Sequence, residues 1–351
     1  MMAKAPSLRR SSSLTAADRM VLRLAFAATF AFAIAALRDW EFSFLAPMLA
    51  IQILAATPAC PNFRQGATIP LVIFLSTNIA LGAATLLMGT PVVLLAAVGV
   101  VICWAFYGQR RGAPAIAVLL VQIAFCCVPL IATISLDVAR DFGDFLLWSS
   151  IAAIITVWIA YALFPQPPSS TPAASGPAPI ALSPARAAHV AISDALVLFP
   201  LLVTFIVRGD INNIVILMIT INLLREIELA HSRRLALAIL LANLLGGVLA
   251  VFAHQFILLP DNLLLFLLTV FLAGLWFSGR LVRGGPMAPV YALAFGTFLL
   301  VLGLAITPLP GGAEELFTVR ISKIVLASLY AIGALSLVAR IRLGPRPNPT
   351  L

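Results

Sequence analysis

Long apolar runs, broken by short polar segments, fill almost the whole chain. The runs lie at about 20–37, 42–58, 67–88, 91–108, 114–136, 145–164, 188–207, 211–225, 235–257, 262–279, 286–307 and 318–339. Most approach the ~20 residues that an α-helix needs to cross a bilayer. The pattern therefore predicts an all-α, polytopic integral membrane protein with about 12 transmembrane helices.

Between the sixth and seventh runs the chain changes character. Residues 165–185 are rich in Pro, Ser, Ala and Gly, which is typical of an exposed, flexible linker. We therefore expect an N-terminal tail at 1–18, a first membrane repeat at 19–164, this linker, a second membrane repeat at 186–340 and a C-terminal tail at 341–351.

The two halves carry similar patterns at similar spacing. Residues 104–114 spell W-x6-R-G-x-P, and residues 276–286 spell the same pattern. In the third run of each half, an asparagine precedes a glycine by four residues, at Asn78 and Asn243. Internal similarity of this kind indicates duplication, and an even number of helices per half makes the repeats parallel. We expect two parallel six-helix repeats.

Positive charge alternates from loop to loop. Lys and Arg concentrate in every second loop and in both tails, whereas most acidic residues fall in the other loops. The positive-inside rule then predicts that both termini are cytoplasmic. The net charge of +9 follows from this distribution, so it does not indicate a nucleic-acid partner.

Composition and motifs narrow the function. A mean hydropathy of +1.09 with 10% charged residues excludes a water-soluble protein. The chain has no G-x-x-x-x-G-K-[ST], H-E-x-x-H or G-x-S-x-G motif, so we expect no enzyme and no direct use of ATP. The four cysteines show no C-x-x-C spacing and the three histidines are scattered, so we expect no metal and no cofactor.

Ionisable residues inside apolar runs are costly and are candidates for function. Asp194 lies about one turn into the seventh run, and Arg23 lies at a similar depth in the first. A cross-repeat ion pair is one hypothesis, with Asp194 as a proton acceptor or Arg23 as an anchor for an anionic substrate. The alternative is that both side chains extend to the cytoplasmic interface.

Other polar residues within the apolar runs have two alternative interpretations each. Asn78 and Asn243 either join helices by hydrogen bonds or contact a substrate, and the same alternatives hold for Gln52, Asn222 and Gln122. Arg320 and Lys323 begin the last run one turn apart, where they form a substrate exit site or anchor the helix at the interface.

Residues 22–85 also resemble a known family. Three stretches carry the likeness: LRLAFAATFAFAIAALRDW, FLAPMLAIQILA and NFRQGATIPLVIFLSTNIALGAAT. They are similar to the membrane unit of the fusaric acid resistance and aromatic acid exporter family. Arg64 and Gly66 keep only part of the Arg-x-x-Gly pattern that begins a small-residue helix in that family. The chain lacks the large cytoplasmic domains of the larger members of that family.

The resemblance implies a bacterial inner-membrane efflux subunit for aromatic carboxylic acids or similar amphiphilic compounds. Such a subunit is driven by an ion gradient and works with a periplasmic adaptor of the membrane-fusion type. The lipid bilayer and a small organic anion are then its other partners, and a homo-oligomer is left open. Two alternatives remain: a channel-like conductor of organic anions, and a membrane enzyme or scaffold that acts on lipid-linked substrates.

Overall fold

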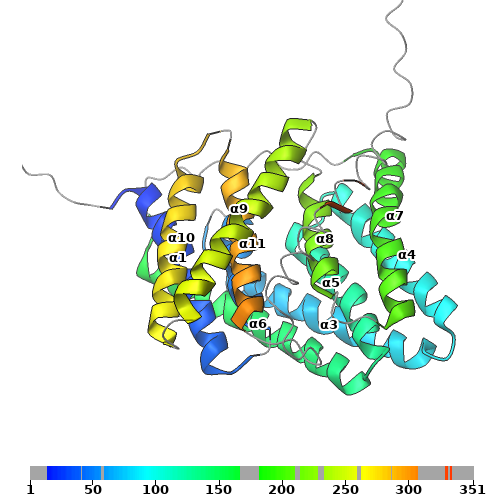
Figure 1. Cartoon of the computed structure of the whole chain (residues 1–351). Helices are drawn as coiled ribbons and strands as arrows, with labels where there is room; N and C mark the ends of the chain where they lie inside the picture. The colour runs from blue at the N-terminus through cyan, green and yellow to red at the C-terminus, as the bar shows by residue number, and fades with distance from the viewer. Residues whose placement is uncertain are drawn as a thin grey trace, which may run out of the picture.

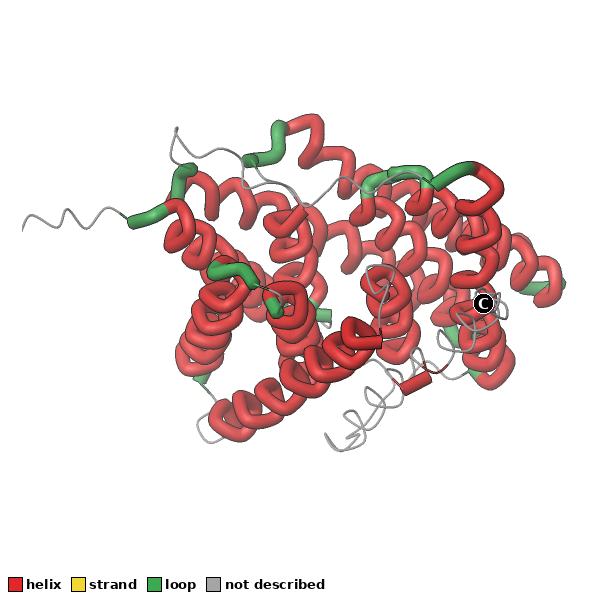
Figure 2. Tube along the Cα trace, turned by 90° about the horizontal axis from the view of Figure 1, so that it is seen from above, coloured by secondary structure: helices red, strands yellow, loops and turns green. Residues whose placement is uncertain are grey.

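The structure is a computed structural model, and every regular element in its described part is a helix. It describes residues 14–40, 42–56, 59–166, 182–209, 214–227, 233–258, 262–285 and 287–306, together with 329–330 and 333. This part contains eleven long helices and no strand (Figures 1 and 2). The prediction of an all-α chain is confirmed for these residues.

The first half of the chain supplies six helices. They are α1 (Ala16–Leu37), α2 (Leu45–Ala56), α3 (Phe63–Leu87), α4 (Pro91–Arg110), α5 (Ala115–Ala132) and α6 (Leu136–Leu163). The second half supplies α7 (Pro184–Arg208), α8 (Ile214–Ile227), α9 (Arg233–Leu258), α10 (Leu263–Val282) and α11 (Ala288–Ile306). The expected run at 318–339 lies almost wholly outside the described residues, as do Arg320, Lys323 and most of the expected linker.

Ten of the eleven helices begin close to where the apolar pattern predicts, and α6 is the exception. It begins nine residues before the expected 145, because its first nine residues include four charged ones: Asp137, Arg140, Asp141 and Asp144. The Ser135 side chain accepts a hydrogen bond from the Val138 N–H at 3.4 Å, which caps the helix, and Asp137 favours the positive end of the helix dipole. In the apolar pattern, this polar beginning of a helix therefore looks like a loop.

Among the residues that the structure describes, seven helices are long and apolar enough to cross a membrane: α1, α3, α4, α5, α6, α7 and α10. At 1.5 Å per residue, a helix of about 20 residues spans the ~30 Å hydrocarbon core. Large apolar side chains on the outside of the bundle are exposed, among them Leu86 at 83% and Val92 at 78%. Such surfaces require lipid rather than water, so the chain is a multi-pass membrane protein in contact with the bilayer.

The helices pack both within each half of the chain and across the two halves. α1 packs on α10, and α4 packs on α7, while α3 packs on α5 and α9 on α11. In Figure 1, α1, α9, α10 and α11 lie together on the left, and α3, α4, α5, α7 and α8 lie together on the right. The helix α5 is the most enclosed of the seven candidate spans, and it is apolar on all sides, as buried helices are.

Small residues allow the closest helix contacts. Gly274 on α10 lies against the backbone of Ala25 on α1, where an added Cβ would come within 2.9 Å of the Ala25 Cα. Gly246 on α9 lies against the Ala294 carbonyl oxygen on α11 in the same way. Small residues at helix contacts are the usual means of close packing in membranes.

Candidate functional site

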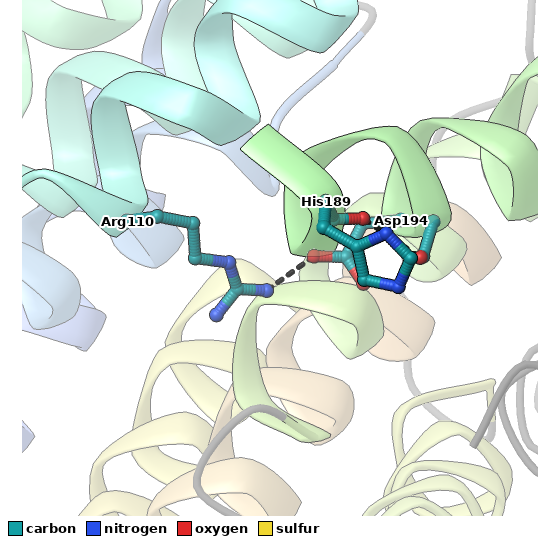
Figure 3. A network of polar contacts seen from close by, with 4 residues as sticks. Arg110, His189 and Asp194 are labelled. Atoms are coloured by element: carbon teal, nitrogen blue, oxygen red, sulfur yellow. Dashed lines mark hydrogen bonds and ion pairs between the residues drawn. The ribbon is translucent and has the colours of Figure 1, made fainter. Parts of the chain in front are cut away.

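A buried ion pair joins α4 to α7. The Arg110 Nη2 atom donates to the Asp194 Oδ2 atom, and each side chain is 3% exposed. Arg110 is the last residue of α4, and Asp194 lies in the third turn of α7. Figure 3 shows the two side chains extending toward each other from their separate helices.

The directions of the helices explain why these two residues meet. Gly99 on α4 lies against the Phe199 ring on α7, and the Arg110 carbonyl at the other end of α4 accepts a hydrogen bond from the Leu182 N–H at 3.1 Å. The helices are therefore antiparallel. Side chains lean toward the N-terminus of their own helix. Because the two helices are antiparallel, the Arg110 and Asp194 side chains lean toward each other.

Two residues after α4 fix the start of α7. The Arg111 Nη1 atom donates to the Leu182 carbonyl at 3.0 Å, and Gly112 adopts a φ of 93°, which favours glycine. The R-G-x-P motif of the first half is therefore a structural turn that holds the end of α4 against the beginning of α7. Arg111 positions the helix that carries Asp194.

His189 lies five residues before Asp194 on α7 and is drawn beside the pair in Figure 3. It is exposed, and its carbonyl accepts a hydrogen bond from the Ser193 hydroxyl at 2.8 Å. Within the described residues, no group of three His, Cys, Asp or Glu side chains could hold a metal ion.

Beside the ion pair, a cavity of about 470 Å³ lies between the same two helices. Its lining consists of Cys103, Trp104, Tyr107, Pro184, Ala188, Ala191 and Ile192. Tyr107 precedes Arg110 by one turn, and Ala191 precedes Asp194 by one turn. The cavity and the ion pair therefore occupy neighbouring turns of α4 and α7.

Arg23 does not pair with Asp194, so that hypothesis is wrong. Its Nε atom donates to the Phe164 carbonyl at 2.9 Å, and its guanidinium lies 4.5 Å from the centre of the Tyr161 ring. It caps the C-terminal end of α6, where a cation is favourable. The physical reason is the helix packing: α1 contacts α10, α2 and α6, whereas α7 contacts α4.

The Arg23 guanidinium also acts on the loop between α2 and α3. Burial raises the pKa of the Cys60 thiol, and the positive charge of Arg23 lowers it by a smaller amount. The Trp158 Nε1–H donates to the neighbouring Pro61 carbonyl at 3.0 Å, which ties this loop to α6.

The two equivalent asparagines behave differently. The Asn243 Oδ1 atom accepts a hydrogen bond from the Thr297 hydroxyl at 2.5 Å, which joins α9 to α11. This geometry agrees with its interpretation as a link between helices. Asn78 is exposed on α3, and its Nδ2 atom donates to the Phe74 carbonyl of its own helix at 2.7 Å. Asn78 therefore does not link two helices of this chain.

Among the other candidates, Gln52 is half-buried on α2. Asn222 belongs to α8, but its side chain lies outside what the structure describes. Gln122 on α5 is 1% exposed, and neither its Oε1 nor its Nε2 atom has a hydrogen-bond partner in the described part of the chain. An unsatisfied amide in the interior costs about 1–3 kcal/mol, so Gln122 is a candidate for function.

Sequence reasoning missed Arg110. Arg110 stands beside Arg111 at the end of an apolar run, where the positive-inside pattern alone accounts for an arginine. One signal could have identified it: the buried stripe Leu94, Val98, Ile102 and Phe106 continues at the same four-residue spacing to Arg110.

Fold and site together define a multi-pass helical membrane protein with a charge pair buried between two of its helices. Residues 20–162, which are less than half of the chain, match the model of a family described as a protein of unknown function, DUF2955. This description does not name the fusaric acid resistance family. No curated protein and no solved structure matches the chain.

Proposed function

We propose that the protein is a secondary exporter of aromatic carboxylic acids or similar amphiphilic anions in the bacterial inner membrane. The observation that carries this proposal is the buried ion pair between Arg110 and Asp194. Charges within a membrane bundle are expensive to bury, and they are characteristic of substrate and proton pathways. The resemblance of residues 22–85 to an exporter family supports the same substrate class.

The pair can couple a proton to an organic anion by exchange of partners. While Asp194 is ionised, its carboxylate neutralises Arg110. When Asp194 accepts a proton, that charge pair is lost, and the guanidinium is able to bind the carboxylate of a substrate instead. Release of the anion then allows Asp194 to lose its proton and to pair with Arg110 again. Proton and substrate are therefore bound together and released together at one site.

The direction of transport follows from the orientation expected from the arginine distribution. With both termini cytoplasmic, the end of α4 and the beginning of α7 lie near the cytoplasmic side, so the pair is close to the substrate supply. No net charge crosses the membrane when a proton and a carboxylate move together, so the outward concentration gradient of the substrate, rather than the membrane potential, drives export. A periplasmic adaptor would then carry the substrate onward, and a homo-oligomer of the membrane unit is compatible with this arrangement.

We also propose that the architecture consists of two six-helix repeats, related by an axis along the membrane normal. Helix contacts that this relation makes equivalent support it. The contact of α1 with α10 corresponds to the contact of α7 with α4. Likewise, the contact of α3 with α5 corresponds to that of α9 with α11, and the contact of α2 with α11 to that of α8 with α5. Each spatial group of helices would then combine elements of both repeats.

The charge pair occurs at only one of the two corresponding crossings. In the second half, Val282 follows Trp276 by six residues, as Arg110 follows Trp104 in the first half. In the first helix of each half, Leu24 precedes Arg38 by fourteen residues, as Asp194 precedes Arg208. Val282 and Leu24 thus correspond to Arg110 and Asp194. The α1–α10 crossing therefore has two apolar residues where the α4–α7 crossing has two charges. This asymmetry supports a specialised role for α4 and α7.

Flux into proteoliposomes tests the proposal. Purified protein is reconstituted, a pH gradient is imposed, and transport of radiolabelled benzoate is followed for the unsubstituted chain and for Asp194→Asn. We expect gradient-dependent flux that Asp194→Asn abolishes, because the amide cannot exchange a proton. Asp137→Asn, which changes an exposed carboxylate at the start of α6, serves as the control and should transport normally.

Unchanged flux in Asp194→Asn would remove this residue from the mechanism. Flux that ignores the pH gradient would instead favour a channel-like conductor of organic anions. Formation of a product without net flux would favour a membrane enzyme.

A further inference from the structure

The cavity between α4 and α7 opens on the side of the bundle. Trp104 and Ile192, which line it, are 72% and 59% exposed. Both belong to helices that are apolar and long enough to span the membrane, so their exposed faces meet lipid. The cavity volume of about 470 Å³ falls within the ~300–1,000 Å³ of small-molecule sites. We call this feature the α4–α7 cleft.

The lining of the α4–α7 cleft is suited to an apolar body. None of its seven side chains carries a charge at neutral pH. The rings of Trp104 and Tyr107 meet edge to face, with their centres 6.4 Å apart, and offer aromatic surface to a ligand. At the corresponding place in the second half, Trp276 instead packs on Tyr291 and lies under the Arg280 guanidinium.

Positive charge lies at one end of the α4–α7 cleft. Arg111 is exposed, and its guanidinium donates to the Leu182 carbonyl, two residues before Pro184 of the lining. Arg186, in the first turn of α7, is also exposed. A ligand with an apolar body and an anionic head therefore finds apolar surface within the cleft and cations at its end.

We propose that the α4–α7 cleft is a side entrance, through which a membrane-dissolved amphiphilic anion reaches the ion pair from the lipid rather than from water. This inference rests on the proposed transport function for its biological role, although binding to the cleft can be measured without transport. A ligand in the cleft lies one turn away from both Arg110 and Asp194, so movement along the two helices brings its head to the pair.

Cys103 offers a direct measure of occupancy because it lines the α4–α7 cleft and is partly exposed. Cys126 and Cys127 are buried, so Cys60→Ser removes the other exposed thiol among the four cysteines. In this variant of the full chain, held in detergent micelles, N-ethylmaleimide should modify Cys103. We expect 1-naphthoate to slow the modification in proportion to its concentration, and acetate, which has the charge without the apolar body, to have no effect.

A pair of substitutions on α7 locates the protection. Ala188→Trp fills the α4–α7 cleft, whereas Leu196→Trp adds the same ring at a lipid-facing position outside the lining, where Leu196 is 63% exposed. We expect Ala188→Trp to weaken protection by 1-naphthoate about tenfold or more, a loss of ~1.4 kcal/mol or more in binding free energy. Leu196→Trp should leave protection unchanged. Helical content and monodispersity of both variants are measured first.

Equal protection in both tryptophan variants would overturn the proposal, as would protection by acetate. Protection by added phosphatidylglycerol but not by 1-naphthoate would also overturn it, because the α4–α7 cleft would then hold a structural lipid. Flux without protection of Cys103 would contradict this inference and leave the transport function standing. Protection without flux would support the α4–α7 cleft as a binding site and contradict the exporter.

Discussion

At the scale of single residues, Arg110 and Asp194 form the feature of this chain that stability alone explains least well. Burying two charges costs several kcal/mol per ion, and their attraction in the interior only partly offsets that cost. Apolar residues at the same positions would make a satisfactory helix contact, as Leu24 and Val282 suggest at the corresponding places of the other half. The proposed transport cycle gives the pair a role that folding does not require.

Removal of one partner should be far more damaging than removal of both. Asp194→Leu removes the carboxylate that is paired with the buried Arg110 guanidinium, so we expect the free energy of unfolding to fall by about 3–5 kcal/mol. The double variant Arg110→Met/Asp194→Leu should recover most of that loss without recovering transport. Denaturant unfolding in mild detergent measures the first effect, and benzoate flux measures the second. A single variant as stable as the unsubstituted chain would mean that the pair is not buried as described.

Gln122 provides a second test in which stability and function should change in opposite directions. Replacing it with leucine removes two polar atoms that have no hydrogen-bond partner in the described residues, so we expect stability to rise by about 1–2 kcal/mol. If the amide contacts the substrate, flux falls in the same variant, and Gln122→Asn, which keeps an amide, retains part of it. A loss of stability in Gln122→Leu would show that the amide has a structural partner.

The sequence indicated one member of the ion pair and not the other, for a physical reason. An acidic residue within an apolar run is rare, so Asp194 was recognisable. Arginine at the end of a run is expected from membrane topology alone, so Arg110 looked ordinary. For Arg23, sequence indicated the depth in the membrane but not the neighbouring helix, and the hypothesis therefore chose the wrong partner.

At the scale of helices, apolar length was a reliable guide, because the bilayer sets the number of residues in a span. It failed at the beginning of α6, where four charged residues lie on a helix that the N-cap Ser135 starts early. It also could not tell which face of a helix meets lipid. Asn78 and Asn243 hold matching positions in their runs, yet one is exposed and the other joins two helices.

Two neighbouring glycines of α9 test the packing of that helix. A Cβ at Gly246 would collide with the Ala294 carbonyl and approach the Thr297 Cβ to 3.0 Å, whereas a Cβ at Gly247 meets nothing within 4 Å. We expect Gly246→Ala to lower the free energy of unfolding by about 1–3 kcal/mol through overpacking. Gly247→Ala should be neutral or stabilising by up to ~1 kcal/mol, because alanine favours the helix. Equal effects in thermal unfolding would contradict the contact between α9 and α11.

At the scale of the whole molecule, the halves of the chain are interlocked rather than side by side. α1 contacts α10, and α4 contacts α7, so each group of helices contains elements from both halves. The sequence predicted two similar halves, but similarity does not reveal how they pack. That information depends on which helix faces complement each other across the chain.

Interlocking predicts how a divided chain behaves. If the polypeptide is split between residues 172 and 173, within the expected linker, we expect neither half to accumulate alone, because each exposes helix faces that the other half covers. Co-expressed halves should purify as one complex by a tag on either half. A half that accumulates and remains monodisperse alone would mean that the contacts between α1 and α10 and between α4 and α7 contribute little to stability.

The central claim is that Asp194 exchanges a proton in step with the movement of an anion. It is tested most directly by a pH indicator trapped in proteoliposomes, with benzoate added outside and no pH gradient imposed. We predict that benzoate drives proton movement through the unsubstituted chain and that the signal vanishes in Asp194→Asn but persists in Asp137→Asn. Benzoate flux with no accompanying proton movement would contradict the account.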